Sequence, residues 1–585
     1  MRKTKILATL GPATKDVATI KQMIKNGMNA ARVNFSHGTY ESHSEIINML
    51  KQARKELNKP IALVLDTKGP EIRIKSFETD KIYLEQGANF TLTTRDIVGN
   101  QEIVSVTYED LPKDLTVGSR VLIDDGLLEL KVTALTKTDV KCVLINSGFI
   151  SARKGVNIPD VYVNLPSLTE QDIEDIKFGI KMEFDFIAAS FVRTAADILN
   201  IRKVLTDNGG GHIHIIAKIE SREGVDNIDS ILAVADVIMV ARGDLGVEIP
   251  PEEVPIVQKN LIRQCNQVGK PVITATHMLE SMVSNPRPTR AEANDVANAI
   301  YDGSDVIMLS GETASGQYPA ESVDMMARIA TRVESSSDYT SMYADHNRNL
   351  SRNITNAISV AAVTTAAALE AACIVPITDS GFASRMVSRC RPYCPILAIT
   401  ADEFVCRQLN LSWGCVPVLS EPFTGDSEVF DIAEDMAMKY DLAKAGETII
   451  SVAGVPVGVA GTTNTMKVRT VGNVLCKGKG NKRGVVQGIT RIFGSQEEVE
   501  RPYFEQGDII ICTQTSDKMM EYIKKAGAIV IGTWEQQVDL SHAETVARAL
   551  DIPLLITNVR AVDFVAQGLP VTVDTDEGLL INGYR

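Results

Sequence analysis

The feature that most constrains the fold is a regular alternation between apolar segments of strand length and segments with helical periodicity. It runs through residues 1–335 and gives eight candidate strands, each followed by a helical segment. The strands are expected at residues 6–11, 29–36, 61–67, 184–192, 213–220, 237–244, 271–278 and 305–313. Eight buried strands, each followed by a helix, predict a closed parallel (β/α)8 barrel. Periodicity alone also permits an open, doubly wound sheet.

The connection after the third expected strand departs from this alternation of strand and helix segments. Residues 71–166 contain short alternating segments and few helical patterns. They predict a small β-barrel domain inserted into a loop of the larger barrel. Such loops lie on the face that carries the active site of a (β/α)8 barrel, so we expect a mobile lid. The catalytic barrel would then comprise residues 1–70 and 167–340.

Two more domains are expected beyond the barrel. Residues 336–350 are polar and predict a linker, and residues 351–473 alternate again between helix and strand patterns, as in a separate α/β domain. The segment CKGKGNKRG at 476–484 predicts a second linker, because it is rich in glycine and lysine. Residues 485–585 predict a C-terminal α/β domain.

Composition excludes several classes of protein. The formal net charge of the 585-residue chain is −14, which argues against nucleic-acid binding. No run of 18 apolar residues occurs, so no membrane span is expected. The nine cysteines are scattered without a CxxC pair, which predicts reduced, buried thiols rather than disulfides or a zinc site. We therefore expect a cytoplasmic protein.

Polar residues at the ends of the expected strands are the main sign of function. Barrel strands should be apolar, so polar groups at their carboxyl ends need a reason, and all of them would gather on one face. These residues are Arg32, Asn34, Ser36, His37, Asp66, Thr67, Lys68, Ser190, Lys218, Glu220, Arg242, Gly243, Asp244, Thr276, His277, Glu312 and Thr313.

Glu220 and Asp244 supply the oxygen ligands that Mg²⁺ or Mn²⁺ prefers, and two carboxylates leave positions for substrate and water. Lys218 precedes Glu220 by two residues, so both should point to the same side of a strand. Its ammonium could stabilise a phosphoryl group in transit or an enolate. Arg32 offers a bidentate fork for a phosphate. Gly243 and Asp244 precede an expected helix start, whose N–H groups suit a carboxylate.

Structural interpretations of the same residues remain open. Lys218 and Glu220 could form an ordinary surface pair. Asp66 could cap a helix, and Arg32 could form a structural ion pair with Glu312. Asn34 and Ser36 could serve only to satisfy backbone groups of their loop. Because polar groups end seven strands in succession, we favour a functional site over these separate explanations.

The chain resembles the pyruvate kinase family over residues 1–473. The motifs that carry the resemblance are KTKILATLGPAT, NAARVNFSHG, LDTKGPEIR, RKGVNIP, IAASFVR, AKIES, VARGDLGVEIP, VITATHMLESM, NPRPTRAEANDVANAIYDGSDVIMLSGETA and GTTNTMKV. The resemblance implies transfer of the phosphoryl group of phosphoenolpyruvate to ADP, which yields pyruvate and ATP in the last step of glycolysis. It also implies a homo-oligomer, with a homotetramer expected.

Roles for the catalytic residues follow from the resemblance. Arg32 would bind the substrate phosphate, and Lys218 would stabilise the phosphoryl group and the enolate. Gly243, Asp244 and Thr276 would hold the substrate, with Thr276 near the path of protonation. The divalent ion, Mg²⁺ or Mn²⁺, would lie on Glu220 and Asp244.

The resemblance also implies a nucleotide site and a potassium site. Arg73 and Lys154 would bind the nucleotide phosphates as the lid closes, with His37 and Asn34 beside the nucleotide. K⁺ would lie on Asn34, Ser36, Asp66 and Thr67. Glu71 is the residue found in the potassium-dependent branch of the family, so we expect activity to require potassium.

Two positions depart from the family pattern. His277 stands where glutamine is expected after Thr276, which could alter proton relay, although a packing change is the simpler interpretation. The segment TDSGFAS resembles the loop that binds the phosphate of an allosteric effector, a phosphorylated sugar or nucleotide, but Ala383 lacks a hydroxyl. The effector site would comprise Thr378, Ser380, Gly381 and Ser384, unless the segment is an ordinary turn.

Residues 485–585 resemble the swivelling phosphohistidine domain of phosphoenolpyruvate-utilising enzymes. His542 aligns with the phosphorylated histidine, but Ser541 stands where that motif has cysteine, and GTWEQQVDL replaces its glycine-rich segment. We therefore expect a structural or regulatory role rather than a phosphocarrier.

Two other functions remain open at this stage. A metal-dependent lyase or aldolase on a similar barrel would need Glu220, Asp244 and Arg32 but neither lid nor nucleotide. A non-catalytic sensor or phosphocarrier would show no turnover and a labile phosphate on His542.

Overall fold

The computed structural model describes residues 1–336, 353–422, 425, 428–456, 463–494, 503–532 and 539–584. The chain divides into two compact units, one of Met1–Val360 with Thr378–Pro422 and one of Ala361–Ile377 with Phe423–Arg585. The four predicted domains and their boundaries stay predictions. Nearly all of the predicted linker at 336–350 lies outside the described residues.

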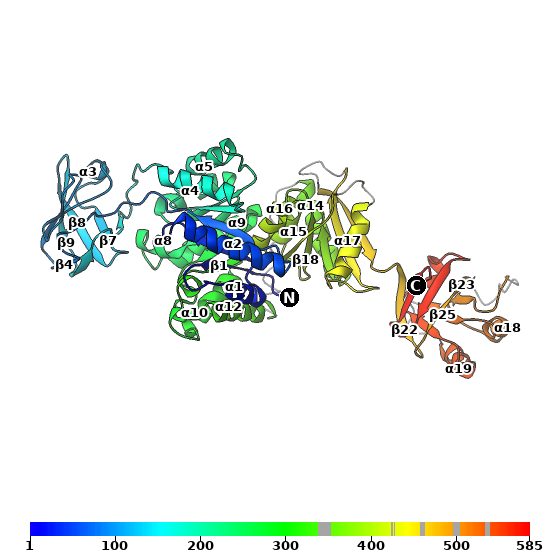
Figure 1. Ribbon diagram of the computed structural model, residues 1–585. Coiled ribbons are helices and arrows are strands. Elements are labelled where there is room, and N and C mark those ends of the chain that lie inside the picture. The colour runs from blue at the N-terminus through cyan, green and yellow to red at the C-terminus, as the bar shows by residue number, and fades with distance from the viewer. Residues whose placement is uncertain are drawn as a thin grey trace. The chain divides into compact units, whose positions relative to one another are not determined.

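Eight parallel strands of the first unit close into a barrel, as predicted (Figure 1). The spatial order is β1-β16-β15-β14-β13-β12-β3-β2, so the open sheet is excluded. The strands are β1 (Lys5–Leu10), β2 (Ala30–Asn34), β3 (Ala62–Asp66), β12 (Phe186–Ala189), β13 (His214–Ile219), β14 (Val237–Ala241), β15 (Val272–Ala275) and β16 (Val306–Leu309).

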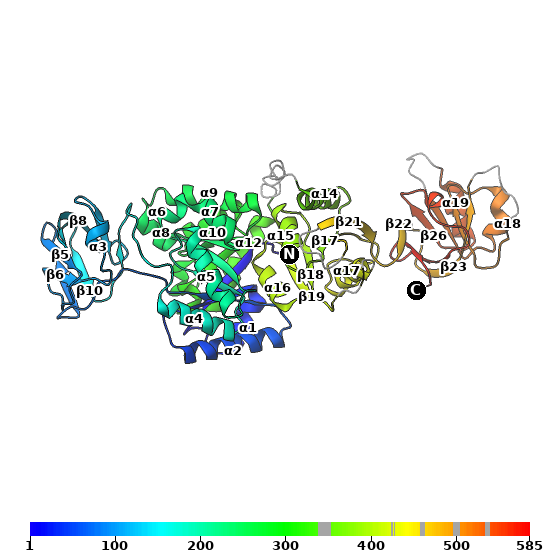
Figure 2. The same cartoon turned by 90° about the horizontal axis from the view of Figure 1, so that it is seen from above.

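Helices that follow these strands cover the outside of the barrel (Figure 2). They are α1 (Val17–Asn26), α2 (Tyr40–Glu56), α4 (Glu170–Lys181), α5 (Ala195–Asp207), α6 (Arg222–Asp226), α7 (Ile228–Val234), α8 (Arg242–Glu248), α9 (Val254–Val268), α10 (Arg290–Tyr301), α11 (Gly311–Ala314) and α12 (Pro319–Glu334), with a 3₁₀ turn η1 (Glu280–Val283). Several begin at side-chain caps, such as Thr39 before α2 and Thr289 before α10, which satisfy free backbone N–H groups.

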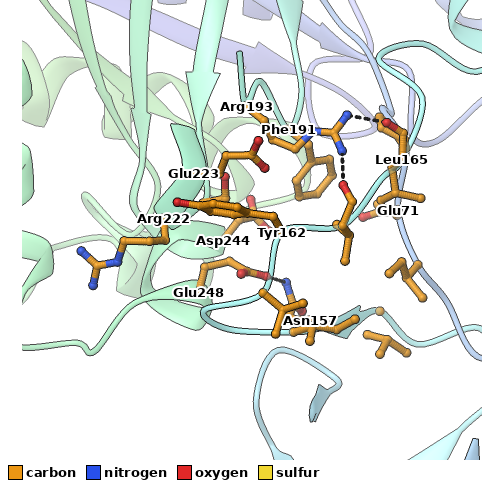
Figure 3. Close-up of a pocket in the computed structure, with 18 of the residues that line it drawn as sticks. Glu71, Asn157, Tyr162, Leu165, Phe191, Arg193, Arg222, Glu223, Asp244 and Glu248 are labelled. Atoms are coloured by element: carbon orange, nitrogen blue, oxygen red, sulfur yellow. Dashed lines mark hydrogen bonds between the residues drawn. The ribbon is translucent and has the colours of Figure 1, made fainter. Parts of the chain in front are cut away.

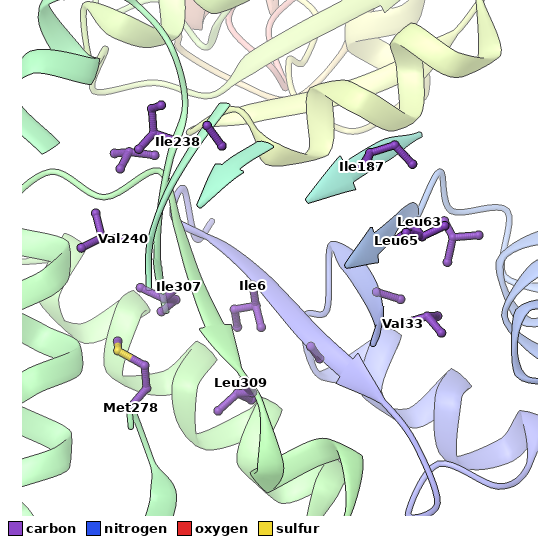
Figure 4. Packing of buried hydrophobic residues seen from close by; sticks show 14 of the residues in the cluster. Ile6, Val33, Leu63, Leu65, Ile187, Ile238, Val240, Met278, Ile307 and Leu309 are labelled. Atoms are coloured by element: carbon purple, nitrogen blue, oxygen red, sulfur yellow. The ribbon is translucent and has the colours of Figure 1, made fainter. Parts of the chain in front are cut away.

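The strands bury both of their faces. On β1, Ile6 and Ala8 point outward into the layer between strands and helices, which Figure 4 shows, whereas Leu7 belongs to a second cluster inside the barrel. Alternate residues of a strand face opposite sides, so near-continuous apolar segments are required. This explains why the strands were predictable from hydrophobicity.

The carboxyl ends of two strands are shorter than predicted. Residues 242–244 begin helix α8 instead of ending β14, and residues 311–313 begin α11 instead of ending β16. Gly243 and Asp244 therefore lie within the first turn of the short helix α8. The helix expected after them is also present, because α9 begins at Val254.

The inserted segment is rich in strands, as predicted, and has its own apolar core. Its strands form a six-stranded sheet of order β11-β7-β8-β9-β5-β6 and a two-stranded sheet of β10 and β4. The elements are β4 (Lys81–Leu84), β5 (Asn89–Thr93), β6 (Ile103–Ser105), α3 (Leu111–Asp114), β7 (Arg120–Ile123), β8 (Leu128–Leu135), β9 (Asp139–Leu144), β10 (Gly148–Ser151) and β11 (Val156–Asn157).

Strands and helices alternate after the barrel, as predicted. In the first unit β18 pairs in parallel with β19, and in the second β17 pairs in parallel with β20, which pairs antiparallel with β21. The elements are α14 (Ile354–Ala368), β17 (Cys373–Pro376), α15 (Phe382–Arg389), β18 (Ile396–Thr400), α16 (Glu403–Gln408), η3 (Leu409–Leu411), β19 (Cys415–Leu419), α17 (Glu428–Lys439), β20 (Thr448–Gly454) and β21 (Thr463–Thr470).

The C-terminal part contains a second closed barrel, of order β22-β26-β25-β24-β23-β27-β28. Its elements are β22 (Val474–Gly480), β23 (Val485–Phe493), β24 (Ile509–Cys512), η4 (Asp517–Met519), α18 (Met520–Ile523), β25 (Ala528–Gly532), α19 (Ser541–Ala549), β26 (Leu554–Thr557), η5 (Ala561–Asp563), β27 (Pro570–Asp574) and β28 (Leu579–Asn582).

The predicted linker at 476–484 is wrong, because β22 occupies much of it. Gly478 and Gly480 lie where the backbone passes close to its neighbours. A Cβ atom at Gly478 would lie 2.2 Å from the carbonyl oxygen of Ile556, and one at Gly480 would lie 2.3 Å from that of Thr575. These glycines serve close packing of a strand rather than flexibility.

All nine cysteines are free and buried, which confirms the predicted thiols. Among the described residues, no helix is long and apolar enough to cross a bilayer.

Candidate functional site

The strand period brings the polar residues into the mouth of the first barrel. On β13, Ile216 belongs to the cluster inside the barrel, so Lys218 and then Glu220 continue on the same side at steps of two. The same step leads from the interior residue Ala30 to Arg32 and from Val64 to Asp66. Side chains far apart in the sequence therefore meet above the apolar interior.

Lys218 lies at the centre of this group. Its Nζ atom is 2.7 Å from Ser190 Oγ, 3.1 Å from Asp66 Oδ1 and 3.0 Å from Glu220 Oε1. The side chain is only 12% exposed. Burial by itself would lower the pKa of Lys218, but Asp66 and Glu220 reverse this effect and raise it. The ammonium is therefore charged at neutral pH and held in one position.

Arg32 is fixed to the same aspartate. Its Nε donates to Asp66 Oδ2 at 2.5 Å, and its Nη1 donates to Thr9 Oγ1 at 3.1 Å. Burial favours protonation of Asp66, but Arg32 and Lys218 outweigh it and lower the pKa of this carboxyl. Asp66 thus holds both cations side by side at the barrel mouth.

Three structural interpretations of these residues are wrong. Lys218 and Glu220 are not a surface pair, because Glu220 is 1% exposed. Asp66 accepts from two cationic side chains and does not cap a helix. Arg32 pairs with Asp66 rather than with Glu312, whose carboxylate instead accepts two backbone N–H groups.

Glu220 and Asp244 fit a divalent ion by their chemistry. Oε2 of Glu220 accepts the N–H of Phe191 at 2.6 Å, whereas the buried Oε1 accepts no hydrogen bond within the described part of the chain. Burial raises the pKa of Glu220 to about 7. Lys218 opposes this shift, whereas the nearby negative charge of Asp244 adds to it. No cluster of three or more His, Cys, Asp or Glu suited to a metal occurs among the described residues.

Thr276 has an unusual backbone. Its φ of 66° is rare for a β-branched residue, and His277 follows with a φ of 54°. Oγ1 of Thr276 accepts the N–H of Gly243 at 2.8 Å. Arg242, which pairs with Asp295 through two contacts of 2.8 Å, donates to the carbonyl of Thr276 at 2.6 Å. The predicted substrate-carboxylate residues are thus adjacent and held in a strained turn.

The residues predicted to bind potassium are neighbours at the ends of β2 and β3. Asn34 lies opposite Asp66 in the strand register, and its side-chain oxygen accepts the N–H of Ser36 at 3.1 Å. Thr67 follows Asp66, and its Oγ1 accepts the N–H of Ser190 at 3.3 Å. Carboxylate, amide and hydroxyl oxygens are hard donors that suit a cation of this kind.

Of the predicted nucleotide residues, Asn34 lies opposite Asp66, whereas Arg73 and Lys154 form their ion pairs with residues outside this cluster. Arg73 in the lid pairs with Glu71, with its Nε 2.7 Å from the carboxylate, and Lys154 lies 2.8 Å from Asp124 Oδ1. His37 is exposed after β2. The structure places Arg73 and Lys154 on neighbouring lid segments, since Arg73 bridges to the residue after Lys154.

A cavity of about 110 Å³ lies between the lid and the barrel (Figure 3). Arg193 lines this cavity and donates to the carbonyls of Val163 and Leu165 at 2.9 and 2.7 Å. Asn157, which also lines it, donates to Glu248 at 2.8 Å. These contacts tie the returning connection of the lid, residues 157–165, to the barrel. Asp244 lines the cavity, but Lys218 and Arg32 do not, so it is not the centre of the chemistry.

The predicted effector loop begins helix α15. Gly381 has a φ of 75°, a conformation that favours glycine, and Ser380 is exposed beside it. Thr378 and Ser384 are buried. The structure thus brings these residues onto one turn but exposes only part of them.

His542 lies in the first turn of α19, with Ser541 before it. Its Nδ1 is 2.9 Å from Thr515 Oγ1, and its Nε2 is 3.3 Å from Asp517 Oδ1. The ring is therefore oriented by a hydroxyl and a carboxylate from the segment after β24. Residues 533–538, within the segment that replaces the glycine-rich motif, lie outside the described residues.

Sequence reasoning missed the roles of two residues. Ser190 was noted only as a strand end, yet its hydroxyl contacts Lys218 and donates to the carbonyl of Thr67 at 2.6 Å. Phe191 supplies the N–H that fixes Glu220, from a backbone with φ of 55°. The two-residue step from Ala188 could have indicated Ser190, but no sequence signal marks a backbone donor.

A closed (β/α)8 barrel with a buried lysine and two carboxylates at its mouth defines the class of this protein as a barrel enzyme. The family model described as "Pyruvate kinase, barrel domain" matches residues 1–323, and "Pyruvate kinase, alpha/beta domain" matches residues 356–469. The chain belongs to the pyruvate kinase family and is a kinase of the phosphotransferase class. The model "PEP-utilising enzyme, mobile domain" matches residues 504–578, which confirms the resemblance of the last domain.

Individual relatives agree with this assignment. The chain is 45% identical to a pyruvate kinase of Sporosarcina psychrophila over 586 residues, with 100% of this chain and 99% of the relative covered. It is 45% identical to one of Geobacillus stearothermophilus, with the same coverage. A crystal structure of a pyruvate kinase from Cryptosporidium parvum matches with a TM-score of 0.77 and 40% identity, over 80% of this chain and 96% of that one.

Proposed function

We propose that the chain transfers the phosphoryl group of phosphoenolpyruvate to ADP at the mouth of its first barrel. The observation that carries this proposal is the position of the Lys218 ammonium, 3.0 Å from the Glu220 carboxylate and above the interior of the barrel. Phosphoryl transfer spreads negative charge over several oxygens, so catalysis rests on positioning and on fixed cations. A charged, buried lysine beside an arginine meets that need.

Arg32 would bind the phosphate of the substrate. Its Nε and Nη1 are already occupied by Asp66 and Thr9, which leaves Nη2 to point at a ligand. Lys218 would meet the phosphoryl group in transit and then the enolate oxygen. Both cations are held in advance by Asp66, so little reorganisation is needed when substrate binds.

Mg²⁺ or Mn²⁺ would be held by Glu220 and Asp244. The fit rests on Glu220 Oε1, a buried oxygen without a hydrogen bond in the described structure, and on the carboxylate chemistry of both residues. When bound, the ion would neutralise charge on phosphoryl and carboxylate oxygens. With only two protein ligands, substrate and water would complete its coordination.

K⁺ would be held by Asn34, Ser36, Asp66 and Thr67. These residues lie together at adjacent strand ends and present oxygen donors. When bound, this ion would add a further positive charge beside the phosphate site. Glu71 pairs with Arg73 in the lid and is not one of these proposed donors.

Gly243 and Thr276 would orient the substrate carboxylate, together with Asp244. The hydrogen bond from Gly243 to Thr276 Oγ1 fixes the hydroxyl, which donates to the carbonyl of Ala275 at 2.6 Å. Protonation of the enolate at carbon would occur near this hydroxyl, through water. A strained backbone at Thr276 is consistent with a position selected for function.

The nucleotide would be bound by Arg73 and Lys154 of the lid, with His37 and Asn34 beside it. The two lid cations now pair with Glu71 and Asp124, at partly exposed positions. Exposed pairs of this kind are weak, so phosphates could replace the carboxylates as the lid closes.

Allosteric activation by a phosphorylated metabolite would use the turn before α15. The exposed Ser380 and the left-handed Gly381 support this proposal, whereas Thr378 and Ser384 are buried. A homotetramer and a cytoplasmic location remain expectations from the family.

The test is a coupled assay of pyruvate formation from phosphoenolpyruvate in Mg²⁺ and K⁺, with and without ADP. Turnover that depends on ADP supports the kinase. Turnover without ADP would favour a lyase, and the absence of turnover with a labile phosphate on His542 would favour a phosphocarrier.

A further inference from the structure

A second cavity of about 110 Å³ lies at the starts of the barrel strands, opposite the catalytic cluster. It is bordered by His214 at the start of β13, by Lys270 just before β15, and by Arg385 of helix α15. Since a cavity of about 10–15 Å³ already holds one water molecule, this one has room for a small polar group. The charged residues that line the cavity indicate which kind of polar group it would bind.

Arg385 and Lys270 bring two positive charges to the cavity. Nη1 of Arg385 donates to the carbonyl of Ser380 at 3.2 Å, and Nζ of Lys270 donates to the carbonyls of Leu232 and Ala235. Within the described ranges, neither side chain has a carboxylate oxygen within 4.0 Å. Burial lowers the pKa of both groups, which means that both positive charges are poorly solvated.

The acidic lining residue, Asp236, favours the charged forms of both Arg385 and Lys270, but it is a single carboxylate that also pairs with Arg202. Asp236 is paired with Arg202 and accepts the N–H of Ile215 at 2.8 Å. His214 adds no charge, since burial lowers its pKa to about 4. Asp236 opposes that shift and Arg385 strengthens it, so the imidazole is neutral at pH 7. The cavity therefore has an excess of positive charge.

We propose that this cavity binds the phosphate group of a small molecule, either inorganic phosphate or a phosphate ester, between Arg385 and Lys270. A guanidinium presents a planar fork to phosphate oxygens and an ammonium adds a point charge. Two buried cations that share one carboxylate with Arg202 are costly, and a bound dianion reduces that cost. The site is distinct from the catalytic cluster and from the proposed effector turn, although Arg385 contacts the carbonyl of Ser380.

His214 allows this site to be followed separately from other phosphate sites of the full-length enzyme. Its imidazole resonances, assigned with a His214→Gln variant, are titrated with pH in the presence and absence of inorganic phosphate. A bound phosphate should raise the pKa of His214. In Arg385→Met and Lys270→Met this shift should require at least about tenfold more phosphate, because a charge-assisted hydrogen bond is lost.

The matched control is Arg328→Met, which removes an exposed arginine of α12 and should leave the response unchanged. A parallel titration with glycerol phosphate distinguishes the two sources: the ligand that acts at the lower concentration is the better fit. Unaltered His214 resonances in phosphate would overturn the proposal. So would an equal response to acetate, or a response to phosphate in both cavity variants that equals that of the wild type. If one cavity variant does not fold, the other carries the comparison.

Discussion

Nζ of Lys218 lies 3.0 Å from Oε1 of Glu220, yet this buried carboxylate oxygen accepts no hydrogen bond within the described structure. The lysine is therefore close enough to form an ion pair with the carboxylate, but it does not donate a hydrogen bond to Oε1. Oε2 is fixed by the N–H of Phe191. Oε1 is therefore a buried carboxylate oxygen not engaged in a hydrogen bond within the described structure, which is the basis for the proposed metal site.

We predict that Glu220→Gln weakens Mn²⁺ binding by more than about tenfold, because a neutral amide replaces a charged ligand. Mn²⁺ titration followed by water-proton relaxation measures this. Glu223→Gln is the matched control, since Glu223 lines the cavity beside the lid and takes no part in the cluster. Equal Mn²⁺ affinity in wild type and Glu220→Gln would remove Glu220 from the metal site.

Potassium should activate the enzyme strongly. The oxygen donors Asn34, Ser36, Asp66 and Thr67 lie at adjacent strand ends, and the resemblance implies that they hold K⁺. Steady-state rates in potassium chloride should exceed those in choline chloride at equal ionic strength. Thr67→Val should reduce this difference. Full activity in choline chloride would contradict a potassium site.

A buried carboxyl at the other end of the barrel should make stability depend on pH. Asp185 accepts from Arg407 Nε at 2.7 Å and from the N–H of Leu63 at 2.8 Å. Burial raises its pKa to about 6, although Arg407 opposes the shift. The folded state therefore binds this proton more tightly than the unfolded state, whose carboxyl has a pKa near 3.8. The associated stability is present below pH 3.8 and is lost as pH rises through 6.

We therefore predict that the thermal midpoint of Asp185→Asn, relative to wild type, rises between pH 4 and pH 7. The underlying change in the free energy of unfolding is at most about 3 kcal/mol. Asp324→Asn on the exposed face of α12 is the control and should show no such trend. A pH-independent difference for Asp185→Asn would show that this carboxyl titrates normally.

His542 should be dispensable for turnover. Its ring is oriented by Thr515 and Asp517, but we expect a structural or regulatory domain rather than a phosphocarrier. His542→Ala should retain pyruvate formation within about twofold, because the proposed chemistry uses residues of the first barrel and not this ring. Acid-labile label on the wild-type protein after incubation with ³²P-phosphoenolpyruvate, absent from His542→Ala, would contradict this expectation.

The eight barrel strands could be predicted because each is buried on both faces and therefore continuously apolar, as in β3 and β16. The residues at which the strands end could not be predicted in this way. Asp244 was assigned to a strand and lies in α8, because the start of a helix depends on local backbone rather than hydrophobicity. Gly478 and Gly480 were interpreted as a linker because sequence alone does not distinguish a flexible glycine from a closely packed one.

The sequence allowed more of the site residues to be predicted than of the contacts between them. The spacing of Lys218 and Glu220 correctly indicated a shared side of one strand, and the contact between them is observed. The partners of Asp66 were not readable, because an ion pair with Arg32 and Lys218 depends on the closure of the barrel. Contacts made through backbone groups, such as the N–H of Phe191, cannot be predicted from the type of residue, because nearly every residue has the same backbone donor.

The central claim is tested most directly by the rate of ADP-dependent pyruvate formation in Lys218→Met, with Lys177→Met as an exposed control. Circular dichroism and the thermal midpoint verify that both variants fold. We predict that Lys177→Met retains the wild-type rate and that Lys218→Met loses several orders of magnitude in kcat, because the fixed ammonium is absent from the transition state. A folded Lys218→Met variant with near wild-type turnover would contradict the account.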